Sequence, residues 1–312
     1  MQEQFYQACY DGDIILAKKL LNDNPHINIS AYDENAFKLA CANGHLDIAK
    51  WLLEINPQIN ISADDEFVFR GACSNGYLDV VKWLLHVRPQ INISVLDEEA
   101  FRWACAQGHL EISKYLLEVQ PQINISVQDE YAFCEACWNG YLEMIKWLLE
   151  IRPQINISAE DEDAFRGACS NGHLNIAKWL LEIRPQINIS VFNEDPFIGA
   201  CSNGHLNIAK WLLEIRPQIN ISAQNEYAFR YACLHEHLKV AEWLQTLNPY
   251  LYVINYNSDG KYAGYYIRTK EEARWQQTKY LVWLSSTQSP NVNSVFYKLP
   301  FDISRYIIQN FI

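Results

Sequence analysis

Long apolar runs are missing from this sequence of 312 residues. No stretch of 18 apolar residues occurs, so we expect no membrane-spanning helix. The first residues, MQEQFYQACYDGD, carry early acids and lack the apolar segment of a secretory signal. We therefore expect a soluble intracellular protein.

Basic residues are also in short supply. The chain has 25 Lys and Arg against 37 Asp and Glu, a formal net charge of −12. Residues 251–312 hold seven basic and four acidic residues, net +3, which leaves −15 on residues 1–250. Because nucleic-acid binding depends on cations that neutralise phosphates, this excess argues against a nucleic-acid partner. One basic row recurs with the period: Lys38, Arg70, Arg102, Arg166 and Arg230. Acids such as Glu66, Glu98, Glu162 and Glu226 flank it, so we expect these side chains to form local ion pairs.

Residue patterns typical of catalysis or metal binding are scarce. The sequence has no Gly-rich phosphate loop and no nucleophile–base pair outside its periodic positions. Eight of the nine cysteines lie about 32 residues apart at one inward position, and units stacked about 10 Å apart are too distant for disulfides. The exception, Cys134, is expected on an exposed row three residues before Cys137, and no further zinc ligands accompany the pair. Cys233, His235 and His237 cluster only because two of them occupy routine periodic positions. We expect free buried thiols, no cofactor, no metal and no enzymatic activity.

The sequence is rich in aromatic residues and in internal repetition. It is 49% hydrophobic and contains 13 Phe, 18 Tyr and 10 Trp, which excludes wholesale disorder. The segment NGHLDIAKWLLEINPQINIS begins at Asn43 and returns every 32 residues, at Asn75, Gln107, Asn139, Asn171 and Asn203. Weaker copies begin at Asp11 and His235, which makes eight copies ending near residue 253. Self-similarity at this period predicts stacked repeats.

Each repeat predicts two helices. A phrase such as AFKLAC, beginning at Ala36, forms the first helix, which Asp33 is expected to cap and which Asn43-Gly44 ends. The apolar positions of LDIAKWLLEI form one stripe of the second helix, which must end before Pro57. Such a short unit buries its stripe only by stacking on the next repeat.

These residues resemble the ankyrin repeat over about 250 of the 312 residues, on the positions Ala40-Cys41, Asn43-Gly44-His45, Leu52-Leu53 and Ile59-Asn60. Asn35-Ala36-Phe37-Lys38 replaces the usual Thr-Pro-Leu-His, and the repeat is one residue shorter than the usual 33. The variant is most similar to the ankyrin proteins of giant DNA viruses that infect amoebae. The implied fold is an all-α ankyrin solenoid of about eight 32-residue helix-turn-helix units over residues 1–253.

The resemblance implies a protein-binding surface on the loop tips and on the exposed side of the first helices. The positions that differ most between repeats lie there, which leaves two explanations, tuning for a partner or drift. Aromatic residues favour tuning because they make interface anchors. The expected client-binding residues are Tyr32, Phe67, Trp103, Tyr131, Trp138, Phe192, Tyr227 and Tyr231.

After Pro249 the period is lost. The segments LYVINY and KYAGYYIR around Asp259-Gly260 predict a β-hairpin, and Thr269 with Glu272 predicts a capped helix to about Leu284. We assign residues 254–295 to a capping hairpin and helix, and residues 296–312 to a further helix. That last helix resembles the start of an F-box, which implies docking on a Skp-type adaptor of a cullin ubiquitin ligase through Leu299, Pro300, Ile303, Ile307 and Ile308. Packing of the same helix on the end of the solenoid is the alternative.

The predicted function is a protein-interaction scaffold in the host cytoplasm that holds a client and recruits a ligase. Two alternatives stay open: a passive decoy for a host protein, or a substrate of an asparaginyl hydroxylase at loop residues such as Asn60, with the tail only capping the solenoid. An enzyme whose site lies in residues 251–312 is disfavoured, because no acid–base pair occurs there.

Overall fold

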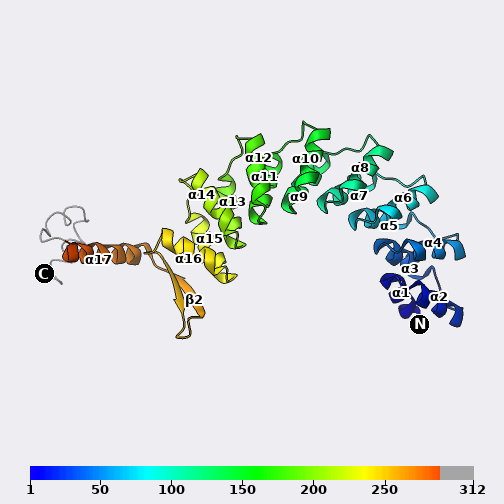
Figure 1. Cartoon of the computed structure of the whole chain (residues 1–312), viewed down its shortest axis with the longest axis horizontal. Coiled ribbons are helices and arrows are strands. Elements are labelled where there is room, and N and C mark those ends of the chain that lie inside the picture. The colour runs from blue at the N-terminus through cyan, green and yellow to red at the C-terminus, as the bar shows by residue number, and fades with distance from the viewer. Residues whose placement is uncertain (289–312) are drawn as a thin grey trace. The chain divides into compact units, whose positions relative to one another are not determined.

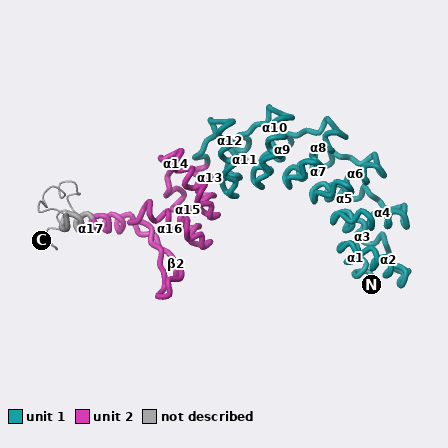
Figure 2. Tube along the Cα trace, in the orientation of Figure 1, with its two compact units in different colours: residues 1–191 teal, residues 192–312 magenta. Residues whose placement is uncertain are grey.

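The computed structural model describes residues 1–288, and their side chains as far as residue 280. It consists of two compact parts (Figure 2): an N-terminal unit of residues 1–191 and a C-terminal unit that begins at Phe192. The described residues form 17 helices and one two-stranded sheet (Figure 1). None of these helices combines the length and apolar character that a membrane span requires.

The N-terminal unit contains six helix pairs, one for each repeat. The first helices of the pairs are α1 (Gln2–Asp11), α3 (Ala31–Ala42), α5 (Ala63–Ser74), α7 (Val95–Ala106), α9 (Val127–Trp138) and α11 (Ala159–Ser170). The second helices are α2 (Ile14–Asp23), α4 (Leu46–Ile55), α6 (Leu78–Val87), α8 (Leu110–Val119), α10 (Leu142–Ile151) and α12 (Leu174–Ile183). Within this unit the first helices pack side by side along the inner side of a curve, and the second helices lie outside them (Figure 1). We call the side formed by the exposed residues of α1, α3, α5, α7, α9 and α11 the inner face.

The C-terminal unit continues the same pattern and then leaves it. Its elements are α13 (Val191–Ser202), α14 (Leu206–Ile215), α15 (Ala223–Leu234), α16 (Leu238–Leu247), β1 (Tyr252–Tyr256), β2 (Tyr262–Ile267) and α17 (Lys270–Gln288). The strands pair antiparallel, with Tyr252 opposite Ile267 and an irregularity after Asn255. The expected helix-turn-helix repeats and C-terminal hairpin are confirmed.

The turn between the two helices of a repeat forms as expected. Gly44 has a φ of 79°, and the backbone N–H of His45 bonds to the carbonyl of Ala40 at 2.8 Å. Glycine has no Cβ, so it adopts this left-handed conformation without the clash that other residues incur. A side chain at Gly44 would also lie 2.3 Å from the ring of Tyr77 in the next repeat.

The core follows the period of the sequence. Phe37, Cys41 and Leu52 are fully buried, and Ile59 is 4% exposed. Tryptophans of the second helices pack on the phenylalanines of the preceding repeat, as Trp83 does on Phe37 with centroids 6.2 Å apart. Each repeat therefore buries its apolar stripe against its neighbour, as expected of stacked repeats.

The start of the first helix differs from the prediction. Asp33 does not cap it, because Tyr32, Asp33 and Glu34 have φ values of 53°, 52° and 65° and form a left-handed turn. The same turn occurs in the six repeats that follow, from Asp64–Glu66 to Gln224–Glu226. Three consecutive non-glycine residues in this region cost about 1–2 kcal/mol each, so the surrounding contacts must hold the turn in place.

The third residue of each left-handed turn is a glutamate that links neighbouring repeats. Glu66, 8% exposed, accepts the backbone N–H of Asn92 at 3.3 Å. The same bond joins residues 26 apart in later repeats of the N-terminal unit: Glu98 to Asn124 at 3.3 Å, Glu130 to Asn156 at 3.2 Å and Glu162 to Asn188 at 3.1 Å. We call these bonds the glutamate links. The second carboxylate oxygen of each of these glutamates is buried without a hydrogen-bond partner.

The hairpin covers the end of the last repeat. Tyr252 of β1 is fully buried and stacks on Phe229 of α15, with ring centroids 4.1 Å apart. Its hydroxyl donates to the carboxylate of Glu226, the third residue of the last left-handed turn. The predicted cap of α17 is confirmed, since the Thr269 backbone N–H donates to Glu272 at 2.7 Å and the Glu272 N–H to the Thr269 hydroxyl at 3.1 Å.

Candidate functional site

The first two predicted binding residues lie at separate places on the N-terminal unit. Tyr32, in the left-handed turn of its repeat, is 75% exposed and meets Tyr6 edge-on at 6.2 Å. Phe67 is 44% exposed and has two cations near its ring, with Lys38 Nζ 5.7 Å and the Arg70 guanidinium 5.9 Å from the ring centroid. Cations near an aromatic face are attracted to its π electrons, so Phe67 is held without being covered.

Trp103 and Tyr131 lie together on the inner face. Their rings are 6.2 Å apart and edge-on, and both are partly exposed. The guanidinium of Arg102 lies 5.0 Å from the Tyr131 centroid and donates to the backbone carbonyls of Asp97 and Leu96. Burial raises the pKa of the Tyr131 phenol, and the nearby Glu135 raises it further. This pair is therefore a neutral aromatic surface with a fixed geometry.

Trp138 also lies on this face but packs against its own chain. Its indole covers Gly167 of the next repeat, and a Cβ on that glycine would lie 2.1 Å from the ring. The indole N–H donates to Asp163 at 3.1 Å, and Asp163 also accepts from Arg166 at 3.3 Å. Burial, together with the charge of Asp163, raises the pKa of the neighbouring Glu135. Trp138 is thus the most constrained of the predicted residues.

The remaining predicted aromatic residues lie in the C-terminal unit. Phe192 is 54% exposed, and its carbonyl accepts from the Gln224 side chain at 3.0 Å. Tyr227 and Tyr231 of α15 stack with centroids 3.8 Å apart and planes 7° apart. His235 approaches Tyr231 edge-on at 5.6 Å. These residues form a second aromatic group, described here only within its own unit.

The predicted ion pairing of the basic row needs correction. The acids named from the sequence are the wrong partners, since Glu66, Glu98 and Glu162 accept backbone N–H groups. The observed ion pairs join Lys38 to Asp64, Arg70 to Glu99 at 2.7 Å and Arg166 to Asp163 at 3.3 Å. Arg70 also donates to the backbone carbonyls of Asp65 and Asp64, at 2.7 and 3.1 Å. Arg70 and Glu99 therefore form a fixed pair on the face, and the sequence analysis did not identify this pairing.

The cysteines and histidines occupy structural positions. All nine cysteines are free and buried, including Cys134, which is 5% exposed where the sequence predicted an exposed row. Burial raises the pKa of each thiol, for example to about 12 at Cys9 and Cys105. His45 and His109 lie at the repeat turns, with Nε2 2.8 Å from the Tyr10 carbonyl and 3.0 Å from the Ser74 carbonyl. No group of three potential metal ligands lies together in the described part of the chain.

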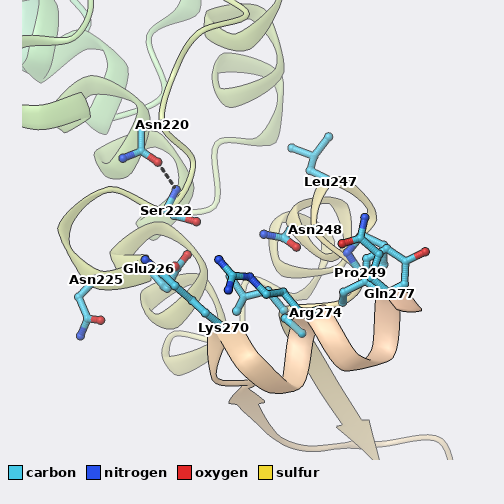
Figure 3. Close-up of a pocket in the computed structure, with 13 residues that line it drawn as sticks. Asn220, Ser222, Asn225, Glu226, Leu247, Asn248, Pro249, Lys270, Arg274 and Gln277 are labelled. Carbon is cyan, nitrogen blue, oxygen red and sulfur yellow. Dashed lines mark hydrogen bonds between the residues drawn. The ribbon is translucent and has the colours of Figure 1, made fainter. Parts of the chain in front are cut away.

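The C-terminal unit also contains a cavity of about 870 Å³ beside α17 (Figure 3). Lys270, Arg274 and Gln277 line it from α17, and Ser222 and Glu226 line it from the last repeat. Its lining combines two cations, one carboxylate and several amide side chains, and that carboxylate already accepts the hydroxyl of Tyr252. Nothing in the sequence pattern had marked this cavity, because about half of its lining comes from the segment in which the period is lost, including Lys270, Arg274 and Gln277.

The five residues predicted to contact an adaptor fall outside the described residues: Leu299, Pro300, Ile303, Ile307 and Ile308.

Comparison with known proteins identifies the repeats. A family model for ankyrin repeats in three copies matches residues 69–161 and 165–253, and a second ankyrin-repeat model matches residues 5–53. The search of curated proteins gave no match. Among solved structures, the chain is similar to the human ASB11 ankyrin repeat domain, with 18% identity, a TM-score of 0.45 and coverage of 62% of this chain and 95% of that one. Since the family models match more than half of the sequence, the chain belongs to the ankyrin-repeat family.

Proposed function

We propose that the inner face of the N-terminal unit binds a client protein, with Phe67, Trp103 and Tyr131 as the central contacts. Ankyrin repeats indicate a protein–protein interaction scaffold, and the fold is typically non-enzymatic. The observation that carries the proposal is the state of these three rings, which are partly exposed yet held by neighbouring cations and rings. Rigid aromatic side chains lose little conformational entropy on binding, which makes them effective anchors.

The other predicted aromatic residues have lesser roles in this proposal. Tyr32, Phe192 and the Tyr227–Tyr231 stack provide additional contacts, while Trp138 shapes the face through its packing on Gly167. Replacing Trp138 would therefore change the surface and the stability together. It is a poorer probe of binding than the three central rings.

The test compares two triple variants by site-specific photo-crosslinking in host lysate. Phe67, Trp103 and Tyr131 are changed to alanine in one, and the control carries alanine at three exposed second-helix positions, Lys114, Lys146 and Glu143. We expect the first variant to lose the crosslinked client while keeping its helical circular dichroism, and the control to keep both. Capture that survives in the first variant and fails in the control would contradict the proposal.

We further propose that Leu299, Pro300, Ile303, Ile307 and Ile308 dock on a Skp-type adaptor of a cullin ubiquitin ligase. The support is the sequence pattern alone, a Leu-Pro start followed by aliphatic residues on one side of a helix. Changing Leu299 and Ile303 to Asp is expected to abolish binding to purified adaptor without lowering the melting temperature. A large loss of stability, with no adaptor bound by the unmodified chain, would favour a capping role.

The alternative function is that of a decoy or of a hydroxylase substrate. Loop residues such as Asn60 are exposed, and the Asn60 side chain accepts the backbone N–H of Ser62 at 3.2 Å. Mass spectrometry of the protein isolated from host cells would detect oxygen added to these asparagines. Modified asparagines together with unchanged client capture would show that the two functions are independent.

A further inference from the structure

The inner face contains a small open socket above Gly71. It has a volume of about 200 Å³ and is lined by Phe67, Arg70, Gly71, Ser74, Glu99 and Trp103. Two aromatic rings form its walls, and its floor is the backbone of α5 at a helical glycine. The socket exists because Gly71 has no side chain and because the nearest atom of the preceding repeat, the Ala42 Cβ, would lie 3.9 Å from an added Cβ.

A glycine at the equivalent position of a later repeat is covered by a ring of the chain itself, which reaches it from the preceding repeat. Gly167 stands 96 residues after Gly71, and Trp138 stands 96 residues after Ala42. Trp138 lays its indole directly over Gly167 and donates its N–H to Asp163 at 3.1 Å. The N-terminal unit therefore contains one helical glycine that a ring covers, Gly167, and one that is left open, Gly71.

We propose that the socket over Gly71 receives an aromatic side chain of the client, which packs on the helical glycine as the Trp138 ring packs on Gly167. The inference rests on the proposed function and names the chemistry that its central contacts recognise. Apolar cavities of about 150 Å³ are large enough to hold benzene, so 200 Å³ accommodates an aromatic ring. Phe67 and Trp103 supply the ring faces and edges against which another aromatic ring packs favourably.

The rim of the socket is already fixed. Arg70 is held by Glu99 at 2.7 Å and by the carbonyls of Asp65 and Asp64 at 2.7 and 3.1 Å. Its guanidinium lies 5.9 Å from the Phe67 centroid, which holds that wall as well. An incoming ring would therefore meet a preorganised site and would have to order few side chains.

The experiment uses indole as the probe and the full chain as the target. Indole is titrated into the unmodified protein while its own resonances and the indole N–H signal of Trp103 are followed by NMR. We expect saturable binding at one site that perturbs Trp103. Changing Gly71 to Leu, the residue found at the equivalent Leu39, should weaken this binding by about tenfold or more because its side chain fills the socket.

A second variant uncovers Gly167. Trp138→Ala removes the ring over Gly167 together with its hydrogen bond to Asp163, so indole should now bind at two sites. Three outcomes would each overturn the proposal. The wild-type protein does not bind indole, the Gly71→Leu variant binds indole as tightly as wild type, or the Trp138→Ala variant binds it with unchanged stoichiometry. Client capture is measured separately. If the protein captures its client but does not bind indole, the socket proposal fails while the proposed client-binding face still stands.

Discussion

We expect the substitution of glycine by alanine to have opposite effects on stability at two helical glycines of the inner face. At Gly71 an added Cβ meets only the Ala42 Cβ at 3.9 Å, whereas at Gly167 it would lie 2.1 Å from the Trp138 ring. Gly71→Ala should raise the free energy of unfolding by about 0.5–1 kcal/mol, because alanine loses less backbone entropy in a helix. Gly167→Ala should lower it by about 1–3 kcal/mol through overpacking.

Urea unfolding of the two glycine variants measures both effects. The decisive comparison is the sign of the change in midpoint at constant slope. Equal shifts in the two variants would mean that Trp138 does not cover Gly167 in solution.

The raised pKa of Glu135 predicts that the stability of the folded protein depends on pH. Its pKa is raised above 4.5 by burial and by the nearby Asp163. The folded protein therefore holds this proton more tightly than the unfolded chain does, so stability falls as pH rises from 4.5 through the folded-state pKa. Glu135→Gln should be more stable than wild type at pH 7, and the difference should vanish on acidification below 4.5.

Thermal melts of both proteins across this pH range provide the test for Glu135. Asp163→Asn, which removes the neighbouring charge but also alters the acceptor of Trp138, serves as a comparison. A Glu135→Gln advantage that is independent of pH would show that packing rather than charge is responsible.

At the residue scale the sequence showed which positions vary between repeats. It did not show which of these side chains pack against their own chain and which are available to a partner. Trp103 and Trp138 looked alike because both are aromatic residues on the variable side of a first helix. Their difference depends on the partner 29 residues beyond Trp138, where Gly167 makes room for the indole. A search for glycines that face large residues one repeat earlier would have found that contact.

Single elements depend on a few contacts, and β1 is the clearest case. Tyr252 stacks on Phe229 and donates its hydroxyl to Glu226, so it fastens the hairpin to the last repeat. Tyr252→Phe should cost about 1–3 kcal/mol, because the partly buried carboxylate of Glu226 loses its donor. Tyr252→Ala removes the ring as well and should cost about 3–5 kcal/mol.

Hydrogen exchange of α15, α16 and the hairpin would measure the effect of the Tyr252 variants where it should occur. Tyr256→Phe is a matched control, since its hydroxyl bonds to Glu242 at an exposed site. Equal losses of protection in Tyr252→Phe and Tyr256→Phe would contradict the fastening role of Tyr252.

Element boundaries were predicted well where a single residue determines them. Gly44 ends a first helix, Pro57 limits a second helix, and Thr269 with Glu272 begins α17. The left-handed turn at Tyr32–Glu34 was missed, because Asp33 in that position is a normal cap by local rules. In the repeats that follow, the glutamate of this turn contacts the next repeat through the glutamate links, which no local pattern reveals.

At the scale of the whole molecule, the nine buried cysteines can report where the chain unfolds locally. Every cysteine is buried, and burial raises each thiol pKa, so few thiolates exist near pH 8. Alkylation by iodoacetamide should be slow in the folded protein and should follow the opening of each repeat. Cys9 should react before Cys105, because α1 packs against one neighbouring first helix, α3, whereas α7 packs against both α5 and α9.

Mass spectrometry of timed samples would rank the nine sites. Full reaction in urea provides the reference for an unprotected thiol. Uniform rates along the chain would indicate one cooperative opening in place of opening repeat by repeat.

The glutamate links have a consequence for the length of the array. Each one joins residues 26 apart, and the donor is a backbone N–H, which any non-proline residue supplies. Removing residues 110–141 would bring Glu98 to the loop that now follows Glu130, with the same spacing and the same donor. No buried acceptor would lose its partner at such a junction. Insertion or deletion of whole 32-residue repeats between Glu66 and Asn188 would therefore keep the glutamate links at the new junction.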